Sequence, residues 1–118
     1  MTFRDADAMI AWLSAVGFTE HATYRDEADS SIVHHAEWVW AGGGGVMFGS
    51  ARPDGVLQNA GRSAAYLVTA DPDAFMANAV AAGSTVLREV VDHDYGGRGG
   101  SIEDPEGNHW SFGSYQPS

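Results

Sequence analysis

The sequence contains no cysteine and no lysine. Without cysteine, the chain can form no disulfide and offers no thiolate as a nucleophile or metal ligand. Without lysine, it can form no Schiff base with a carbonyl compound, and it lacks the lysine of a phosphate-binding P-loop. The chemistry left to its side chains is therefore that of oxygen groups and imidazoles.

Long apolar segments are missing as well. No run of about 18 apolar residues occurs, and residues 1–9 have neither the basic start nor the apolar stretch of a signal peptide. We therefore expect a cytoplasmic protein. With 118 residues, of which 44% are hydrophobic, the chain should form one small domain with much exposed surface, which a second copy would help to cover.

Positive charge is scarce. Sixteen aspartate and glutamate residues stand against six arginines, and the formal net charge is −10. Such a surface repels phosphate backbones and anionic lipids. The arginines are scattered along the sequence, so no basic patch is predicted, and we expect neither a nucleic acid nor a membrane as partner. If the charge serves binding, it favours a cationic ligand; solubility alone would also account for it.

Two stretches of the sequence follow the same pattern. One begins with DADA at Asp5 and ends at Gly17, and the other begins with DPDA at Asp71 and ends at Gly83. Aspartate at the N-cap and glycine after the last turn predict helices over residues 6–16 and 72–82. Their apolar faces are expected to carry Met9, Trp12, Leu13 and Val16 in the first helix and Phe75, Met76, Ala79 and Ala82 in the second.

Strand patterns surround both helices. The chain is therefore predicted to be α+β, a single domain over 1–118 made of two βαβββ modules. The first module covers 1–50 and the second 63–118, and residues 51–62, rich in glycine, proline and asparagine, form the linker. The expected strands are 2–4, which is only a stub, 18–26, 32–40 and 46–49 in the first module, and 65–69, 85–94, 100–103 and 110–114 in the second.

The end of the sequence carries the most specific motifs. Residues 94–98 read DYGGR, and residues 104–110 read DPEGNHW. Together with the two helix starts and the strand GGGGVMFGS, this order resembles the vicinal oxygen chelate (glyoxalase/bleomycin resistance protein/dioxygenase) superfamily, and within it the bleomycin-resistance-like branch. The resemblance covers nearly the whole chain. It implies paired βαβββ modules that form incomplete barrels around a cup, usually with two cups in a homodimer. It leaves the function open, because this fold carries many chemistries.

The resemblance also implies where a metal would be held. The family's enzymes bind a divalent ion through His, Gln or Glu on the first and last strands of each module. In the second module these positions fall on Ala64 and Ser111; in the first module one falls on Met47 and the other would precede Met1. None of these residues binds a metal well, whereas a divalent ion needs about three or four ligands. We therefore expect no metal and no cofactor at the usual site.

A relocated metal site remains an alternative. His35 and Glu37 point to the same face of an extended strand. His109, on the last strand, would complete a set of three ligands. The other interpretation is that these are ordinary cup or edge residues, because the sequence does not reveal which strands pair across the cup.

Alternation along the strands predicts the cup lining once Met47 and Ser111 are placed inside it. The large aromatic residues of the same strands then belong to the core on the helix side. Arg98, in a glycine-rich loop near the cup mouth, either clamps a carboxylate or is a solvent-exposed charge. The predicted ligand-binding residues are His35, Glu37, Met47, Tyr66, Tyr95, Arg98, His109 and Ser111, and the predicted core residues of these strands are Trp38, Trp40, Phe48, Leu67 and Trp110.

These observations favour a metal-free, homodimeric protein that sequesters a small aromatic or cationic molecule, as bleomycin-resistance-like proteins do, and no catalytic residue is assigned. A first alternative is an enzyme: a metal-dependent lyase, isomerase or dioxygenase of the glyoxalase type with a relocated site, or an acid–base catalyst using His109 and Glu37. A second is a structural or regulatory dimer whose cup is filled by Met47 and Tyr66 packing together.

Overall fold

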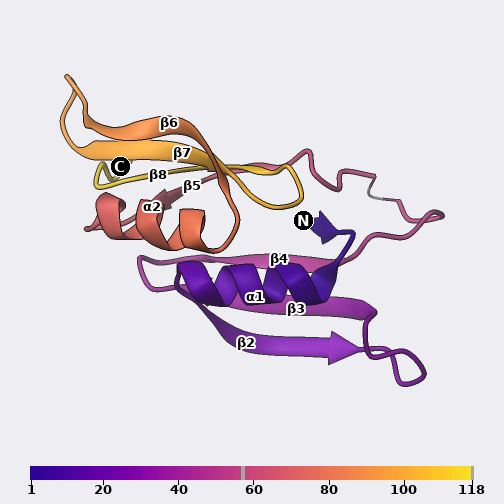
Figure 1. The fold of residues 1–118 in the computed structure, drawn as a ribbon. Helices are drawn as coiled ribbons and strands as arrows, with labels where there is room; N and C mark the ends of the chain where they lie inside the picture. The colour runs from indigo at the N-terminus through magenta and orange to yellow at the C-terminus, as the bar shows by residue number, and fades with distance from the viewer. Residues whose placement is uncertain (57, 118) are drawn as a thin grey trace.

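The computed structural model describes residues 1–56 and 58–117 (Figure 1). A strand, a helix and three strands follow one another twice along the chain. This order confirms the predicted α+β fold. The elements are β1 (Thr2–Phe3), α1 (Ala6–Val16), β2 (Phe18–Arg25), β3 (Val33–Trp40), β4 (Gly45–Ser50), β5 (Ala64–Val68), α2 (Pro72–Ala81), β6 (Thr85–Asp92), β7 (Arg98–Glu103) and β8 (His109–Gly113).

Each module forms one open four-stranded sheet. The strand orders are β1-β4-β3-β2 and β5-β8-β7-β6. In both sheets the first strand lies parallel to the last one, and the remaining pairs are antiparallel. Neither sheet closes on itself, which agrees with the incomplete barrels that the resemblance implies.

Both helices begin at the predicted aspartates. The side chain of Asp5 accepts a hydrogen bond from the backbone N–H of Ala8 at 3.1 Å, and Asp71 accepts one from Ala74 at 3.0 Å. Each aspartate thereby satisfies one of the N–H groups that a helix start leaves without a partner. Gly17 ends α1 in the left-handed region, with φ of 118°, where glycine is the favoured residue. The second helix ends one residue earlier than predicted.

The helix-facing sides of the two sheets share one core. Trp110 of β8 packs on Trp12 of α1, with ring centroids 5.3 Å apart, and Trp40 of β3 packs on Phe75 of α2 at 5.8 Å. The indole N–H of Trp40 also donates to the carbonyl of Val68 at 2.8 Å. These contacts join the two modules. Met9, Trp12, Leu13, Val16, Phe75 and Ala79 are buried as predicted, whereas Met76 and Ala82 are only partly buried.

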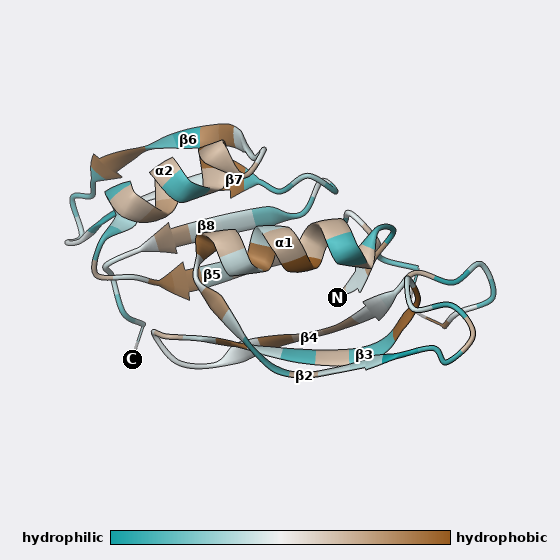
Figure 2. Cartoon of the chain, turned by 60° about the horizontal axis from the view of Figure 1, so that its bottom comes forward, coloured by the Kyte–Doolittle hydropathy of each residue, from teal (hydrophilic) through white to brown (hydrophobic). Residues whose placement is uncertain are grey.

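The molecule is elongated. Its principal extents are 50 × 28 × 24 Å, and its radius of gyration is 14.7 Å, whereas a rounded domain of this length would have a radius of gyration of about 13.5 Å. The difference fits two modules set beside each other, as Figures 1 and 2 show. No helix in the described ranges is long and apolar enough to span a membrane.

One buried carboxylate holds the turn between β7 and β8. Asp104 is only 4% exposed. It accepts hydrogen bonds from the backbone N–H groups of Glu106 and Asn108, from the Asn108 amide and from the Trp110 indole, at 2.8 to 3.0 Å. A buried carboxylate is tolerated only with such partners. The DPEGNHW motif is therefore a structural element of this fold.

The same turn also positions the start of α1. The carboxylate of Glu106 accepts hydrogen bonds from the backbone N–H groups of Arg4 and Asp5, both at 2.7 Å. The last hairpin of the second module is thus fastened to the first helix of the first module.

Candidate functional site

Each sheet has an outer side, opposite the helices, which we call its cup face. In β3 the residues Ala36 and Trp38 are buried while Glu37 and Val39 are not, so the predicted alternation is confirmed. Phe48, Leu67 and Trp110 are buried as well, in agreement with their predicted core positions, and Trp40 is partly buried. The first cup face carries Tyr24, His35, Glu37, Val39 and Met47, and the second carries Tyr66, Ser101, Glu103, His109 and Ser111.

The first cup face combines a carboxylate, an imidazole, a phenol and a thioether. The Nε2–H of His35 donates to Oε2 of Glu37 at 2.9 Å. Tyr24 lies stacked on His35, with an interplanar angle of 16° and ring centroids 6.4 Å apart. Met47 faces Glu37 across the β3–β4 pair. A polar pair with aromatic and sulfur neighbours of this kind suits a flat ligand that carries a positive charge.

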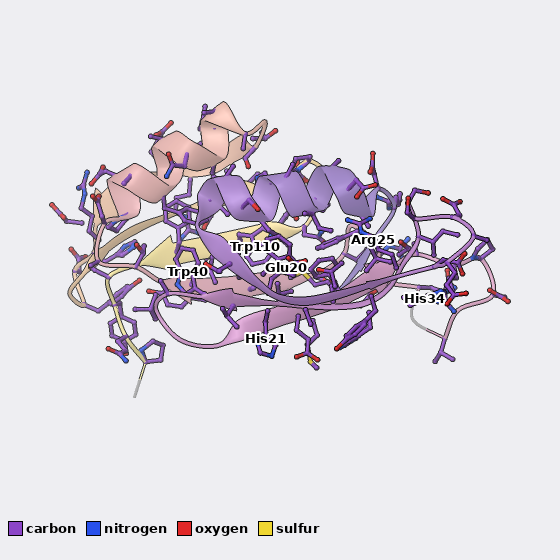
Figure 3. All side chains as sticks on the ribbon, turned by 90° about the horizontal axis from the view of Figure 1, so that it is seen from below. Glu20, His21, Arg25, His34, Trp40 and Trp110 are labelled. Atoms are coloured by element: carbon purple, nitrogen blue, oxygen red, sulfur yellow. The ribbon has the colours of Figure 1, made fainter. Side chains whose placement is uncertain are left out.

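A bulge in β2 brings a further histidine to this side of the sheet. The register between β2 and β3 shifts between Glu20 and Ala22. Figure 3 shows His21 pointing away from α1, whereas Glu20 lies on the helix side. Sequence reasoning missed His21 because a bulge cannot be read from alternation. It also missed Tyr24, because strict alternation from the buried Phe18 would place Tyr24 on the helix side, and only the bulge brings it opposite His35.

The second cup face holds a second pair of imidazole and carboxylate. Nε2 of His109 lies 3.6 Å from Oε1 of Glu103. The hydroxyl groups of Ser111 and Ser101 lie 2.9 Å apart. Glu103 was not among the predicted residues, although it lies directly opposite His109 in the β7–β8 register. Near β8, the second cup face is therefore more polar than the first cup face.

Three tyrosines meet at the other end of the second cup face. The hydroxyl of Tyr66 donates to the carbonyl of Tyr115 at 2.6 Å, and the rings of Tyr115 and Tyr95 meet edge to face at 5.4 Å. Burial raises the pKa of the Tyr66 hydroxyl, and its two neighbours raise this pKa further. A Cβ at Gly113 would lie 3.0 Å from the Tyr66 hydroxyl. The structure thus brings Tyr66 and Tyr95 together through Tyr115, which follows the last strand.

The side chain of Arg98 is directed away from the other predicted ligand-binding residues. Its guanidinium donates to both carboxylate oxygens of Asp73, at 2.9 and 3.0 Å, and to Asp92 at 3.4 Å. Asp73 belongs to the first turn of α2, so Arg98 is directed to the helix side of β7. The ion pair lowers the pKa of the Asp73 carboxyl and raises the pKa of the arginine.

The residues of the proposed relocated metal site are not brought together in one chain. His35 and Glu37 lie on the first cup face, and His109 lies on the second. Within the described residues, no group of three or more histidine or carboxylate side chains is arranged to hold a metal ion.

The positions that hold metal in the family's enzymes also lack suitable ligands. Ala64 offers a methyl group and lies opposite His109 in the β5–β8 register. Met47 offers a thioether, and the Ser111 hydroxyl is engaged with Ser101. Hard divalent ions prefer carboxylate oxygens, and zinc prefers imidazole, thiolate or carboxylate. These residues therefore do not fit a divalent metal.

Two hollows adjoin the cup faces. A cavity of about 410 Å³ lies beside Met47 and His35. A smaller one, of about 240 Å³, lies between the two sheets and is lined by residues that include Trp40, Val46 and Tyr66. Both offer space for a small molecule, and the smaller one lies at the border of the two modules.

Partial similarity links the chain to proteins of unassigned activity. Uncharacterized proteins from Mycobacterium bovis and Mycobacterium tuberculosis are 42% identical to it over 48 residues. That match covers 41% of this chain and 32% and 28% of those proteins. The matched segment therefore spans less than a third of the length of these relatives.

Solved structures resemble the chain over nearly its whole length. TioX from Micromonospora sp. ML1 is 26% identical, with a TM-score of 0.75, and 98% of this chain and 94% of TioX are covered. A glyoxalase family protein from Bacillus cereus is 14% identical, with a TM-score of 0.75 and coverage of 96% and 88%. The fosfomycin resistance protein FosX from Listeria monocytogenes is 14% identical, with a TM-score of 0.70 and coverage of 98% and 89%. The last two similarities show a common fold.

The family assignment rests on the match that covers most of the sequence. Residues 1–112 match the family described as Glyoxalase/Bleomycin resistance protein/Dioxygenase superfamily. The repeated βαβββ order and the two open sheets agree with this match. The chain belongs to the glyoxalase/bleomycin resistance protein/dioxygenase superfamily.

Proposed function

We propose that this chain is a metal-free binding protein that holds a small aromatic or cationic molecule in cups shared between two copies. One observation carries the proposal: both cup faces expose large apolar or aromatic side chains. Met47 and Tyr24 are each 60% exposed, and Tyr66 is 42% exposed. Exposed apolar groups gathered on one face are typical of a binding surface.

The arrangement of the modules supports a homodimer. The two sheets meet through their helix-facing sides, so the cup faces of a single chain are left uncovered. A second copy could place its second cup face over the first cup face of this chain, and the reverse, with twofold symmetry. Such a dimer would bury on the order of 1,500 Å² or more in total. It would also bring His109 of one copy near the first cup face of the other copy, which contains Glu37.

The composition of the first cup face supports a cationic aromatic ligand. Glu37 supplies a negative charge, and His35 and Tyr24 supply flat rings beside it. A cation over an aromatic ring contributes about 0.5–2 kcal/mol, and ring stacking contributes about 0.5–1.5 kcal/mol. These contributions permit micromolar binding without a metal.

The absence of a metal can be tested directly. Structures of FosX are described as complexes with Mn(II), whereas Ala64, Met47 and Ser111 of this chain do not suit such an ion. We expect well under one divalent ion per subunit by elemental analysis of the purified protein. A stoichiometric metal that is lost when His35 or His109 is replaced by alanine would favour the relocated-site enzyme instead.

The binding test uses isothermal titration calorimetry with cationic, neutral and anionic aromatic compounds of similar size. Tryptophan fluorescence would be an indirect reporter, because Trp12, Trp38 and Trp110 are buried on the helix side. Cationic compounds should bind most tightly, and Glu37→Gln should weaken them about tenfold by removing the counter-charge. The control Glu89→Gln removes the same charge from an exposed position on β6. Equal effects of both variants would show that the preference for cationic compounds comes from the net charge alone and not from Glu37.

The oligomeric state is measured in parallel. Light scattering should give the mass of a dimer at micromolar concentration. A monomer that still binds the cationic compounds with unchanged stoichiometry would contradict the shared cup.

An acid–base enzyme is the second candidate, favoured by the two imidazole–carboxylate pairs. The sequence had suggested His109 with Glu37, whereas within one chain Glu37 bonds to His35 and His109 lies near Glu103. An imidazole held by a carboxylate is a common general base. Mass spectrometry of the titrated compounds over time separates the two functions, because a binding protein returns them unchanged.

A further inference from the structure

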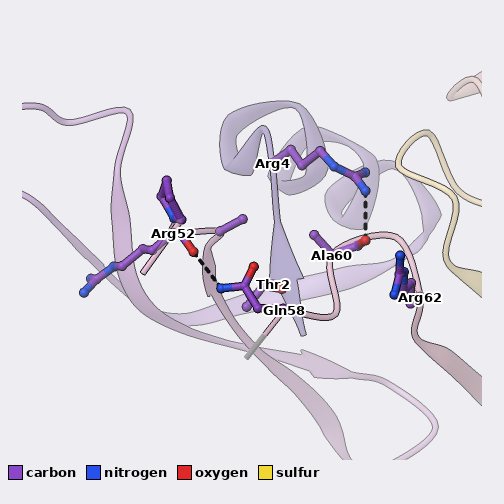
Figure 4. Close-up of a pocket in the computed structure, with 8 residues that line it drawn as sticks. Thr2, Arg4, Arg52, Gln58, Ala60 and Arg62 are labelled. Carbon is purple, nitrogen blue, oxygen red and sulfur yellow. Dashed lines mark hydrogen bonds between the residues drawn. The ribbon is translucent and has the colours of Figure 1, made fainter. Parts of the chain in front are cut away.

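Three of the six arginines gather around one cavity, although they are far apart in the sequence. The cavity has a volume of about 550 Å³ and lies between the start of the chain and the segment that joins the modules. Figure 4 shows Arg4 and Arg62 on one side of it and Arg52 on the other, with the side chain of Arg52 extending away from the other two. No basic patch was expected from the sequence, so this cluster is a product of the fold. The cavity is lined by Thr2, Arg4, Ala51, Arg52, Pro53, Gln58, Ala60 and Arg62.

The positive charge of this cluster is not neutralised by the ion pairs of the described chain. In residues 1–56 and 58–117, the arginine ion pairs are those of Arg25 with Asp7 and of Arg98 with Asp73 and Asp92. Among the residues that the structure describes, the lining contains no aspartate or glutamate, although acidic residues greatly outnumber arginines in the sequence. An uncompensated group of arginines in an acidic protein is the usual mark of an anion site.

Arg4 is held in place by backbone carbonyls. Its Nη2 donates to the carbonyl of Ala60 at 2.9 Å and its Nη1 to the carbonyl of Glu106 at 3.2 Å. Gly61, with φ of 74°, lies against the guanidinium: a Cβ there would approach it to 3.1 Å and the Glu106 carbonyl to 2.6 Å. The glycine therefore permits the close contact. Carbonyls orient the arginine but do not cancel its charge.

Arg52 is oriented by a histidine. Its Nη2 donates to Nδ1 of His34 at 2.7 Å, and Nε2 of His34 lies 3.0 Å from Oδ1 of Asp26. Because Nδ1 accepts from the arginine, Nε2 carries the ring proton and donates it to the aspartate. Two of the three arginines thus have fixed positions before any ligand arrives, which lowers the entropic cost of binding.

We propose that this cavity binds a small polyanion that carries phosphate or carboxylate groups. Its volume lies in the range of small-molecule sites, about 300–1,000 Å³. Guanidinium groups bind both oxyanions with paired hydrogen bonds, and Thr2 and Gln58 supply further polar groups at the lining. A long polyanion such as a nucleic acid is disfavoured, because the net charge of −10 repels it outside the cluster.

The site is separate from the cup faces but close to one of them. None of its lining residues belongs to a cup face as defined above. The neighbouring cavity of about 410 Å³ shares Thr2 and Arg52 with it and continues to His35 and Met47. Arg62 lines the larger cavity but not the neighbouring one, so substitution of Arg62 distinguishes the anion site from the cup.

The test is calorimetric titration with pyrophosphate, citrate and inorganic phosphate at constant ionic strength. We expect saturable binding of pyrophosphate or citrate, and the tighter of the two identifies phosphate or carboxylate as the preferred group. Arg62→Gln and Arg52→Gln should each weaken this binding about tenfold, as the loss of a charge-assisted hydrogen bond predicts. Arg4 is left intact, because its bonds to two carbonyls also support the fold.

The matched control is Arg88→Gln, which removes the same charge from an exposed position on β6. It should leave the affinity within about twofold of the parent. Equal weakening by Arg88→Gln, or no saturable binding of either polyanion, would overturn the proposal. Arg62→Gln should not alter binding of cationic compounds in the cup, and Glu37→Gln should not weaken polyanion binding, so the two proposals fail separately.

Discussion

The two modules share a topology but close their last hairpins by different means. Between β3 and β4 the turn depends on glycine: Gly43 and Gly44 have φ of 108° and 75°, and a Cβ at either position would meet nothing within 4 Å. Between β7 and β8 the turn is built on the buried carboxylate of Asp104. The β7–β8 turn also has a glycine in the left-handed region, Gly107 with φ of 104°. It thus adds a buried polar network to the backbone freedom that the first turn uses.

The modules also divide their stabilising contacts differently. The strand β1 has two residues paired with β4, whereas β5 has five paired with β8. In contrast, α1 buries five residues and α2 buries three. Compared with the second module, the first therefore depends less on its first strand and more on its helix. A repeat in sequence does not imply equal energetic roles, and substitutions at matched positions can measure the difference.

The largest expected effect belongs to Trp110→Ala, which tests whether the modules are independent. Trp110 packs on Trp12 and on Phe18 and donates to Asp104. Removing a buried aromatic side chain costs about 3–5 kcal/mol. Because the core is shared, we expect one unfolding transition at lower urea concentration, with the same midpoint by circular dichroism and fluorescence. Two separate transitions would show that the modules unfold independently.

Asp104→Ala compared with Gly44→Ala measures the two hairpin turns. The first change leaves buried donors of Asn108 and Trp110 without an acceptor and should cost about 3 kcal/mol. The second forces alanine into the left-handed region and should cost about 1 kcal/mol. Urea denaturation of both variants gives the comparison. A cost for Gly44→Ala equal to that of Asp104→Ala would contradict the distinction between the turns.

The helix caps provide a matched pair of smaller effects. Asp5→Ala and Asp71→Ala each remove one side-chain acceptor at a helix start, with a typical cost of about 1 kcal/mol. Thermal unfolding should show similar losses, since the two hydrogen bonds have nearly equal lengths of 3.1 and 3.0 Å. A clearly larger loss for Asp5→Ala would mean that the cap also supports the contact between Glu106 and the start of α1.

The smallest effect concerns the arginine pairs of the two helices. Each helix carries an aspartate in its first turn: Asp7, paired with Arg25, and Asp73, paired with Arg98. Because the pKa of Asp73 is lowered in the folded state, the pair stabilises the fold at pH values above the ordinary pKa of 3.8. This stabilisation is lost as the pH falls through the lower folded-state pKa. Arg98→Gln should raise the pKa of Asp73 toward the ordinary value in an NMR titration. An unchanged titration would show that the pair is broken in solution.

Local signals were sufficient to predict the helices and the faces of the strands. The N-caps Asp5 and Asp71 and the left-handed Gly17 agree with the structure, because capping depends on a few neighbouring residues. The burial of Trp38 and Trp110 follows from alternation along a strand. Predicted strand ends differ from the observed ones by at most two residues, as expected where ends are fixed by pairing.

Contacts between distant residues could not be read from the sequence. The bulge that turns His21 outward depends on pairing with β3. Arg98 finds its partner Asp73 on a helix rather than in the cup. The arginine cavity forms only because the segment between the modules returns to Arg4, through the bond to Ala60. Each of these features depends on tertiary contacts, which local sequence patterns do not reveal.

The bonds from Glu106 to the backbone at the start of α1 have a consequence for how the chain folds during synthesis. They join residues 102 and 101 positions apart. On a ribosome the first helix is therefore without this support until nearly the whole described chain has emerged. Contacts of such long sequence separation slow folding, and domains generally fold as units during synthesis. The first module is thus expected to remain exposed to chaperones and proteases until the last hairpin has formed.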